Sequence, residues 1–299
     1  DMEKVALGRT GLEASVVGLG GGGVSRLGMG TGVSRAESVC LVRSALDLGI
    51  TFFDTAAAYG TESIVGEGIA GHREKVIVST KSHALDDPAA LARSLEESLR
   101  ALGTEYIDIF HLHGVRPERY ERARERQLPV LQRFREQGKI RHIAISENFR
   151  TDMSHEMLQR ALIEGGFEMM MAGFNLFNPS AARRVLAPAR ETGVATLIMF
   201  AVRRALSDPR ALDALLAGLV DIDAGGLRDI VRDGGAKSLV DAGYRYCRQC
   251  APDSVILTGT GNPDHLAENV ASLAAPPLAA DTMARLDALF GHVDFVSGD

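Results

Sequence analysis

The sequence has 299 residues, of which 45% are hydrophobic and 24% charged, and its formal net charge is −6. This length is enough to bury the core of one barrel-sized domain. The acidic balance argues against nonspecific binding to nucleic acids or acidic membranes, because no excess of basic side chains is present to neutralise phosphates. The three cysteines cannot all pair, which favours a reducing compartment.

The N-terminal segment combines a predicted hairpin with a glycine-rich loop. Residues 4–17 alternate apolar and polar types around Gly8-Arg9-Thr10-Gly11, which predicts a small β-hairpin. Residues 16–20 form the first predicted buried strand, and glycines follow as far as Gly23. At Gly22 the backbone could approach a ligand closely, although a flexible loop explains the glycines equally well. The first residues do not resemble a signal peptide, so we expect a cytoplasmic protein.

Three successive apolar runs end at an ionisable residue. Residues 50–53 precede Asp54, residues 76–80 precede Lys81 and residues 107–112 precede His113. Such runs predict buried strands, and Tyr59 follows the first of them closely. In a parallel barrel the carboxyl ends of the strands form one face, where these four side chains should converge. Any one of them alone would be only the first polar residue after a strand.

Strand and helix patterns alternate along the whole chain. Helices are predicted at 34–48, 62–70, 87–102, 117–137, 152–164, 179–191, 237–250, 263–272 and 281–289, and further strands at 140–146, 167–175, 194–202 and 255–257. Residues 203–235 interrupt the rhythm as a long insertion with at least one short helix. The pattern predicts an α/β protein: one (β/α)8 TIM-barrel domain over residues 1–299, with an N-terminal β-hairpin and a long insertion after strand seven.

The four candidate side chains suit the reduction of a carbonyl group. A tyrosine has an ordinary pKa of about 10, and a nearby lysine ammonium is expected to lower the pKa of Tyr59. Asp54 would keep Lys81 charged and in position, while His113 would hydrogen-bond and orient the substrate carbonyl. Because no side chain donates hydride, the reaction implies a nicotinamide cofactor.

The sequence resembles the aldo-keto reductase superfamily from near its N-terminus to the eighth predicted helix. The motifs that carry the resemblance are Leu7-Gly8-Arg9-Thr10-Gly11-Leu12, Phe53-Asp54-Thr55-Ala56-x-x-Tyr59-Gly60, Thr80-Lys81, Tyr106-Ile107-Asp108-x-x-x-Leu112-His113, Arg141-His142-Ile143-Ala144-Ile145-Ser146 and Gly259-x-x-x-Pro263-x-x-Leu266-x-Glu268-Asn269. The resemblance implies an NAD(P)(H)-dependent oxidoreductase that interconverts a carbonyl (aldehyde, ketone or sugar) and an alcohol. Tyr59 would be its general acid and base, tuned by Asp54 and Lys81, and His113 would orient the carbonyl.

The resemblance also implies where the cofactor would lie. Family members bind NADP(H), less often NAD(H), across the C-terminal face of the barrel. The residues implied for this chain are Gly22, Asp54, Ser146, Met171, Met199, Arg203, Gly259, Thr260, His265, Glu268 and Asn269. Ser146 would hold the carboxamide, and residues 259–269 the adenosine end. Because that segment contains no Lys or Arg to grip a ribose phosphate, NAD(H) is possible as well.

Several positions depart from the family pattern. Glu147 follows the strand-five serine where Asn is usual, and Met171 and Met199 stand at the usual Gln and stacking Tyr. Met199 or Phe200 could still cover a nicotinamide face. Arg203 and its neighbour Arg204 would pair with pyrophosphate or an acidic substrate, or would simply be solvated.

The remaining polar residues receive structural interpretations. His111 is expected to point toward the helices, opposite to His113. His83 lies in a loop expected to line the pocket, and substrate contact and a bland role are about equally supported. His72, His142 and His155 are interpreted as surface or packing residues, and Cys247-x-x-Cys250 as packing cysteines. No cluster has metal-ligand spacing, so no metal is predicted.

A second function remains open beside the enzyme. Some relatives bind nucleotide and serve mainly as partners of membrane proteins, so this chain could be a nucleotide-binding regulatory subunit with little catalytic turnover. The expected partner of an enzyme is a small-molecule carbonyl or alcohol. Neither the identity of the substrate nor the oligomeric state can be inferred from the sequence.

Overall fold

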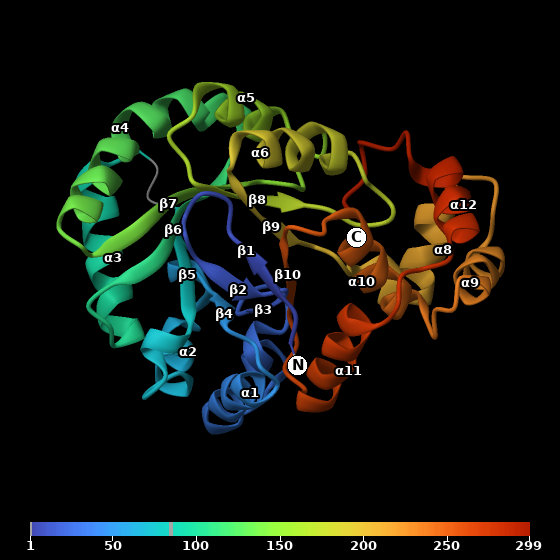
Figure 1. The fold of residues 1–299 in the computed structure, drawn as a ribbon, viewed down its shortest axis with the longest axis horizontal. Helices are drawn as coiled ribbons and strands as arrows, with labels where there is room; N and C mark the ends of the chain where they lie inside the picture. Colours follow the sequence, from blue (N-terminus) through green and yellow to red (C-terminus); the bar gives the residue numbers. More distant parts are fainter. Residues whose placement is uncertain (1, 84–85) are drawn as a thin grey trace.

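A closed barrel of eight parallel strands forms the centre of the computed structural model, which describes residues 2–83 and 86–299 (Figure 1). The strands are β3 (Val17–Gly20), β4 (Phe52–Asp54), β5 (Ile77–Ser82), β6 (Ile107–Val115), β7 (Ile140–Glu147), β8 (Met169–Gly173), β9 (Ala195–Met199) and β10 (Val255–Thr258). Each strand pairs with the next along the chain, and β10 pairs with β3 to close the ring. The predicted (β/α)8 barrel is therefore confirmed.

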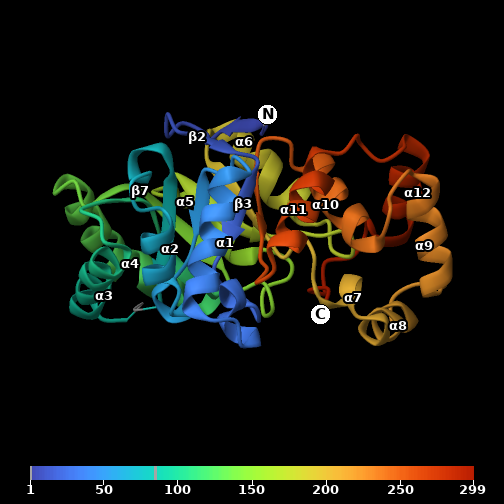
Figure 2. The same cartoon turned by 90° about the horizontal axis from the view of Figure 1, so that it is seen from below.

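Helices surround the barrel, as Figure 1 shows. They are α1 (Arg35–Asp47), α2 (Glu62–Gly68), α3 (Pro88–Leu102), α4 (Pro117–Glu136), α5 (Glu156–Glu164), α6 (Ala187–Thr192), α10 (Leu239–Cys250) and α11 (Pro263–Ala274). Short 3₁₀ segments η1 (Arg26–Thr31), η2 (Ala57–Tyr59) and η3 (Arg73–Lys75) lie in loops, and a π-helical turn η4 (Ala182–Leu186) precedes α6. The predicted hairpin is also present, with β1 (Lys4–Ala6) antiparallel to β2 (Glu13–Ser15) at one end of the barrel (Figure 2).

The capping residues explain why several helices begin and end where they do. Ser34 and Glu37 form a capping box at the start of α1, which satisfies two backbone N–H groups. Asp87 caps α3, Pro88 is its first residue and Gly103 ends it with a φ of 63°. Helix α5 begins later than predicted, because Asp152 lies before it and accepts hydrogen bonds from Glu156 and Met157.

The insertion after β9 is helical. It contains α7 (Arg204–Ser207), α8 (Pro209–Ala217) and α9 (Ala224–Asp233), of which α9 packs against α12 (Ala280–Phe290) to one side of the barrel (Figures 1 and 2). Its apolar residues, such as Leu212, Leu227 and Ile230, are buried and join the main hydrophobic core. The expected insertion with at least one short helix is thus confirmed.

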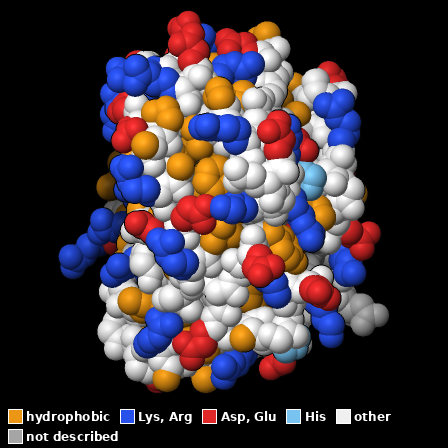
Figure 3. Space-filling view, turned by 90° about the vertical axis from the view of Figure 1, so that its left-hand side faces the viewer, with side chains coloured by type: hydrophobic (Ala, Val, Ile, Leu, Met, Phe, Trp, Pro, Cys, Tyr) orange, Lys and Arg blue, Asp and Glu red, His pale blue; other side chains and the backbone are white. Residues whose placement is uncertain are grey.

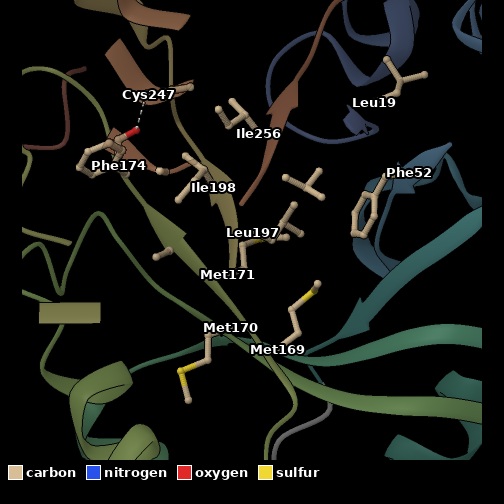
Figure 4. Close-up of a cluster of buried hydrophobic side chains, with 14 of the residues drawn as sticks. Leu19, Phe52, Met169, Met170, Met171, Phe174, Leu197, Ile198, Cys247 and Ile256 are labelled. Atoms are coloured by element: carbon tan, nitrogen blue, oxygen red, sulfur yellow. Dashed lines mark hydrogen bonds between the residues drawn. The ribbon is translucent and has the colours of Figure 1, made fainter. Parts of the chain in front are cut away.

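Apolar side chains fill the barrel beneath its mouth. Figure 4 shows Met169 and Met171 of β8 beside Leu197 of β9, with Phe52 of β4 nearby. This packing leaves polar side chains inside the barrel chiefly near the carboxyl ends of the strands, among them Asp54 and Lys81. A packed interior with functional side chains at the strand ends is the usual arrangement of such barrels.

The surface is mixed in charge. The face in Figure 3, on the side of α3 and α4, intersperses basic with acidic side chains. Residues in or next to these two helices form ion pairs such as Arg119–Asp86 and Lys139–Glu96. Within the described residues, no helix combines the length and the apolar character needed to cross a membrane.

Candidate active site

Asp54, Tyr59, Lys81 and His113 lie together at the mouth of the barrel. The Lys81 Nζ atom is 2.7 Å from both Asp54 carboxylate oxygens, and 5.3 Å from the centroid of the Tyr59 ring. The Tyr59 hydroxyl is 3.5 Å from His113 Nε2. Neighbouring parallel strands place Asp54, Lys81 and His113, and η2 after β4 adds Tyr59. The predicted convergence of the four side chains is therefore present in the structure.

Backbone geometry brings Tyr59 to the site. Gly60 ends η2 with a φ of 72°, a conformation that favours glycine. A Cβ atom at Gly22 would lie 2.6 Å from the Tyr59 ring, so only glycine lets the loop after β3 pass this close. The Thr61 hydroxyl donates to the Gly21 carbonyl and contacts the Thr55 hydroxyl, which fixes the two loops against each other. Gly22 thus contacts Tyr59, while a contact with cofactor stays a prediction.

His113 is positioned by an irregularity in β6. The pairing of β6 with β7 shifts register between Leu112 and Val115, and Gly114 has a φ of 61°. Such bulges redirect side chains. The His83 ring stacks on the His113 ring, with centroids 3.8 Å apart and planes inclined by 14°, and its Nδ1 is 3.1 Å from the His113 carbonyl oxygen. His83 therefore contributes to the wall of the site.

Burial controls the ionisation of the site. Desolvation, together with the nearby Lys81 ammonium, lowers the pKa of His113 far below its usual value, so this imidazole is neutral. Burial also raises the pKa of Asp54 against the opposing effect of Lys81. The pKa of Tyr59 is raised as well, because desolvation and the Asp54 charge outweigh the ammonium. The prediction of a lowered Tyr59 pKa is therefore wrong for this structure, although Lys81 acts in the predicted direction.

His111 corrects a second prediction. Its Nε2 atom is 2.9 Å from the Ser79 hydroxyl, which in turn donates to Asp54 at 2.9 Å. His111 thus lies inside the barrel beneath the site and does not point toward the helices. The physical reason is the strand period of two: residues i and i+2, such as His111 and His113, share one face. Ser79 and Lys81, which are also two residues apart, share the inner face of β5 for the same reason.

The residues implied for the nicotinamide end differ in accessibility. Ser146 is buried, and its Oγ accepts a hydrogen bond from the Gly114 N–H at 2.8 Å, while its hydroxyl hydrogen has no acceptor in the described residues. Met171 is 2% exposed within the barrel core, whereas Met199 is half-buried at the end of β9. A ligand at the barrel mouth would meet Met199 more readily than Met171.

Arg203 contacts an aromatic ring and a carboxylate. Its guanidinium stacks on the Phe200 ring at 3.9 Å and pairs with Asp299, yet its buried Nε has no hydrogen-bond partner in the described residues. Phe200 has a φ of 64°, which is unusual for a residue with a side chain. Arg204, in contrast, is 69% exposed and pairs with Asp208. The solvated interpretation therefore fits Arg204 and not Arg203.

The segment implied for the adenosine end lies at β10 and the start of α11. Gly259 is exposed, and the Thr260 hydroxyl accepts a hydrogen bond from the Asn262 N–H. His265 and Glu268 project from α11 as exposed side chains. Asn269 donates to the Thr258 hydroxyl at 2.7 Å, so its amide is already engaged within the protein.

Glu147 forms a buried hydrogen-bonded contact with His155 that the sequence did not reveal. Its carboxylate lies 2.8 Å from His155 Nδ1 and accepts the Gly173 N–H, while His155 Nε2 is 3.0 Å from the Ser180 hydroxyl. Burial raises the pKa of Glu147. The packing interpretation of His155 is thus correct. The departure from Asn at Glu147 was the only signal, and it did not reveal the partner.

The cysteines and the potential metal ligands were the other side chains considered from the sequence. Cys247 is buried in α10 with Sγ 3.6 Å from the Phe174 carbonyl, and burial raises the pKa of its thiol. All three cysteines are free. No group of three or more potential metal ligands occurs among residues 2–83 and 86–299.

Comparisons with known proteins agree with the geometry. A model of the Aldo/keto reductase family matches residues 17–290. Aldo-keto reductase YhdN of Bacillus subtilis (strain 168) is 33% identical over 220 residues, which are 69% of this chain and 63% of YhdN. The chain thus aligns with less than two thirds of the length of this relative.

Solved structures share the fold. Aldo-keto reductase AKR11C1 from Bacillus halodurans, in its holo form, superposes with a TM-score of 0.75 and 22% identity over 97% of both chains. An aldo/keto reductase from Klebsiella pneumoniae, in complex with NADP and acetate, gives a TM-score of 0.73 and 21% identity over 97% of this chain and 96% of that one.

Proposed function

The chain belongs to the aldo/keto reductase family, and from this premise we propose that it interconverts a small carbonyl compound and its alcohol with Tyr59 as general acid and base. Members of the family are NAD(P)H-dependent oxidoreductases of carbonyls and alcohols. The observation that supports the role of Tyr59 is its contact with His113 Nε2 beside the buried Lys81–Asp54 pair. The substrate oxygen would sit between the phenol and the imidazole.

The neutral imidazole of His113 suits an orienting role. Its Nδ1 is buried without a hydrogen-bond partner in the described residues. Leaving this nitrogen unprotonated costs less free energy than burying an N–H group that has no acceptor. The ring hydrogen then resides on Nε2, which faces the Tyr59 hydroxyl. In reduction, the Nε2–H would hold the carbonyl oxygen and Tyr59 would deliver the proton as negative charge develops. In alcohol oxidation the Tyr59 phenolate would accept that proton.

We propose NADP(H) as the cofactor, with NAD(H) as an accepted alternative. The bound dihydronicotinamide supplies the hydride that no side chain can provide. Among residues 2–83 and 86–299, the Ser146 hydroxyl hydrogen has no acceptor and the buried Arg203 Nε has no partner, so the first fits a carboxamide oxygen and the second a phosphate oxygen. NADP in the Klebsiella neighbour favours the phosphorylated form. The lack of Lys and Arg from 259 to 269 favours tolerance of NAD(H).

The test is turnover of a panel of aldehydes, ketones and sugars with NADPH and NADH, repeated on Tyr59→Phe. We expect kcat to fall by about 100-fold or more, because a general acid contributes about 10²–10⁴. Tyr106→Phe is the matched control, since that ring stacks between Arg73 and Arg141 and should not affect turnover. Equal turnover by Tyr59→Phe and the parent would refute the role of Tyr59. Dinucleotide binding without turnover of any panel member would support a regulatory subunit instead.

A further inference from the structure

A polar chain runs from the Asp54–Lys81 pair into the barrel. Asp54 pairs in register with Ser79 on β5, and Lys81 pairs with His111 on β6. Ser79 therefore lies between Asp54 and His111, 2.9 Å from the carboxylate oxygen Oδ1 and 2.9 Å from His111 Nε2. Ser79 and His111 are both completely buried. Because neither side chain is exposed at the barrel mouth, neither is expected to touch a substrate.

Counting hydrogens assigns each donor in this chain. Lys81 donates to both oxygens of Asp54, which identifies the carboxylate as an anion that can only accept. The single hydroxyl hydrogen of Ser79 must then go to Asp54. The contact between Ser79 and His111 needs a hydrogen of its own, so His111 donates it from Nε2. Burial lowers the pKa of His111 well below its usual value, so the imidazole is neutral and carries one ring hydrogen, which leaves Nδ1 unprotonated.

We propose that Ser79 and His111 are positioning residues that set the proton affinity of Tyr59 through Asp54. This inference rests on the proposed function, in which Tyr59 exchanges a proton with substrate. The Asp54 charge opposes ionisation of the phenol, and Lys81 favours it. Each hydrogen bond that Asp54 accepts disperses its charge, and a donor that is itself hydrogen-bonded gives a stronger bond. Loss of Ser79 or His111 should therefore make Tyr59 harder to ionise.

Other ionisable groups act on the same region and must stay unchanged in the test. They face it from β5, β6, η2, α2 and the loop after β5, and they are Lys81, His113, Tyr59, Glu62 and His83. None of them contacts Ser79 or His111 by a hydrogen bond within the described residues. Substitution of the two positioning residues therefore leaves the hydrogen bonds of these groups in place, and Ser79→Ala, which removes no ionisable group, isolates the support of Asp54 from the electrostatic effect of His111 on His113.

The experiment compares Ser79→Ala, His111→Leu and His111→Gln, each alone and combined with Tyr59→Phe. The first readout is the absorbance of tyrosinate against pH, as the difference between each protein and its Tyr59→Phe counterpart, which isolates Tyr59 from the other four tyrosines. The second is the pH dependence of kcat for oxidation of the best alcohol found in the panel. Ser38→Ala is the matched control, because it also removes a buried hydroxyl, one without a hydrogen-bond partner in the described residues.

Ser79→Ala should move both titrations upward by about half to one pH unit, which is a threefold to tenfold loss of phenolate below the pKa. His111→Leu should shift them less, in the same direction. His111→Gln keeps an N–H at similar reach and should restore the parent curve. KM should not change, because neither residue reaches the substrate. Ser38→Ala should leave both titrations in place.

Two results would overturn the inference. One is a loss of activity in Ser79→Ala and His111→Leu that is equal at every pH with no shift in the Tyr59 titration, as expected from a merely structural role. The other is a His111→Gln titration that matches His111→Leu. The absorbance titration needs no turnover, so it decides this inference even if Tyr59→Phe proves as active as its parent and the proposed function fails.

Discussion

Lys81 carries a buried positive charge that needs hydrogen-bond acceptors. Its side chain is fully buried, and Nζ donates to both Asp54 oxygens at 2.7 Å and to the Thr55 carbonyl at 2.8 Å. All three ammonium hydrogens are thus used. A buried ion pair adds little net stability over apolar residues of similar size, because desolvation offsets the attraction. The pair is therefore better explained by chemistry at the site than by folding.

The balance between desolvation and attraction in this ion pair predicts how substitutions change the free energy of unfolding. Lys81→Met leaves Asp54 buried without its counter-ion and should lower the free energy of unfolding by about 3–5 kcal/mol. The double variant Asp54→Asn with Lys81→Met removes both charges and should recover most of that loss, while activity stays lost in both. Urea denaturation of the parent and the two variants measures the difference.

An exposed pair provides the control. Arg35 and Glu67 are 53% and 52% exposed, and Arg35→Met should lower the free energy of unfolding by no more than about 1 kcal/mol. A Lys81→Met protein as stable as Arg35→Met would contradict the buried-charge argument. So would a double variant that is no more stable than Lys81→Met alone.

Close packing of two helices is visible at Gly66. This residue lies in α2, where a Cβ atom would overlap the backbone carbonyl of Leu102 at the end of α3. In an isolated helix, Gly→Ala gains about 1 kcal/mol of helix propensity. Here we predict the opposite sign: Gly66→Ala should destabilise the protein by about 1–3 kcal/mol, since overpacking forces backbone shifts. Thermal or urea unfolding provides the measurement.

Gly225 is the matched position for that substitution. It is exposed in the first turn of α9, and the nearest atom to its Cβ would be a side-chain oxygen of Asp223 at 3.3 Å. Gly225→Ala should therefore stabilise the protein by up to about 1 kcal/mol. If the two substitutions changed stability in the same direction, local propensity and not helix contact would control both.

Elements with local signals could be predicted from the sequence, and contacts between distant residues could not. Helix α3 has a capping Asp87, an initial Pro88 and a terminal Gly103, and it spans the predicted residues. The strand ends that carry Asp54, Lys81 and His113 follow from apolar runs in the same way. The partner of Arg203 could not be found, because Asp299 lies 96 residues away and depends on the path of the C-terminal segment.

The site shows the same division. The convergence of Asp54, Lys81 and His113 follows from strand order alone, since parallel neighbours end on one face. The inward position of His111 differs from the prediction because residues i and i+2 of a strand share one face, and the sequence contained this signal. The raised pKa of Tyr59 had no such signal, because it depends on how completely the surrounding loops exclude water.

At the scale of the whole molecule, buried ionisable groups make stability depend on pH. Burial lowers the pKa of His111 and His113, so the folded protein resists protons that the unfolded chain binds below about pH 6.5. Their contribution is complete above that pH and is lost as the pH falls. Asp54, Glu62 and Glu147 act in the opposite sense, because their raised pKa values let the folded protein bind protons at higher pH than the unfolded chain.

Substitution can isolate the contribution of one histidine to the pH dependence of the free energy of unfolding. Each neutral buried histidine should lower the free energy of unfolding by about 1.4 kcal/mol for every pH unit below about 6.5. His111→Leu removes one such group, so its stability should fall less steeply than that of the parent between about pH 6.5 and about pH 5, by about this amount per unit. Phe110→Leu, on the same strand, lowers stability without removing an ionisable group and should keep the parent slope. Urea denaturation across this pH range measures all three slopes, and identical slopes for His111→Leu and the parent would mean that His111 takes up a proton in the folded barrel.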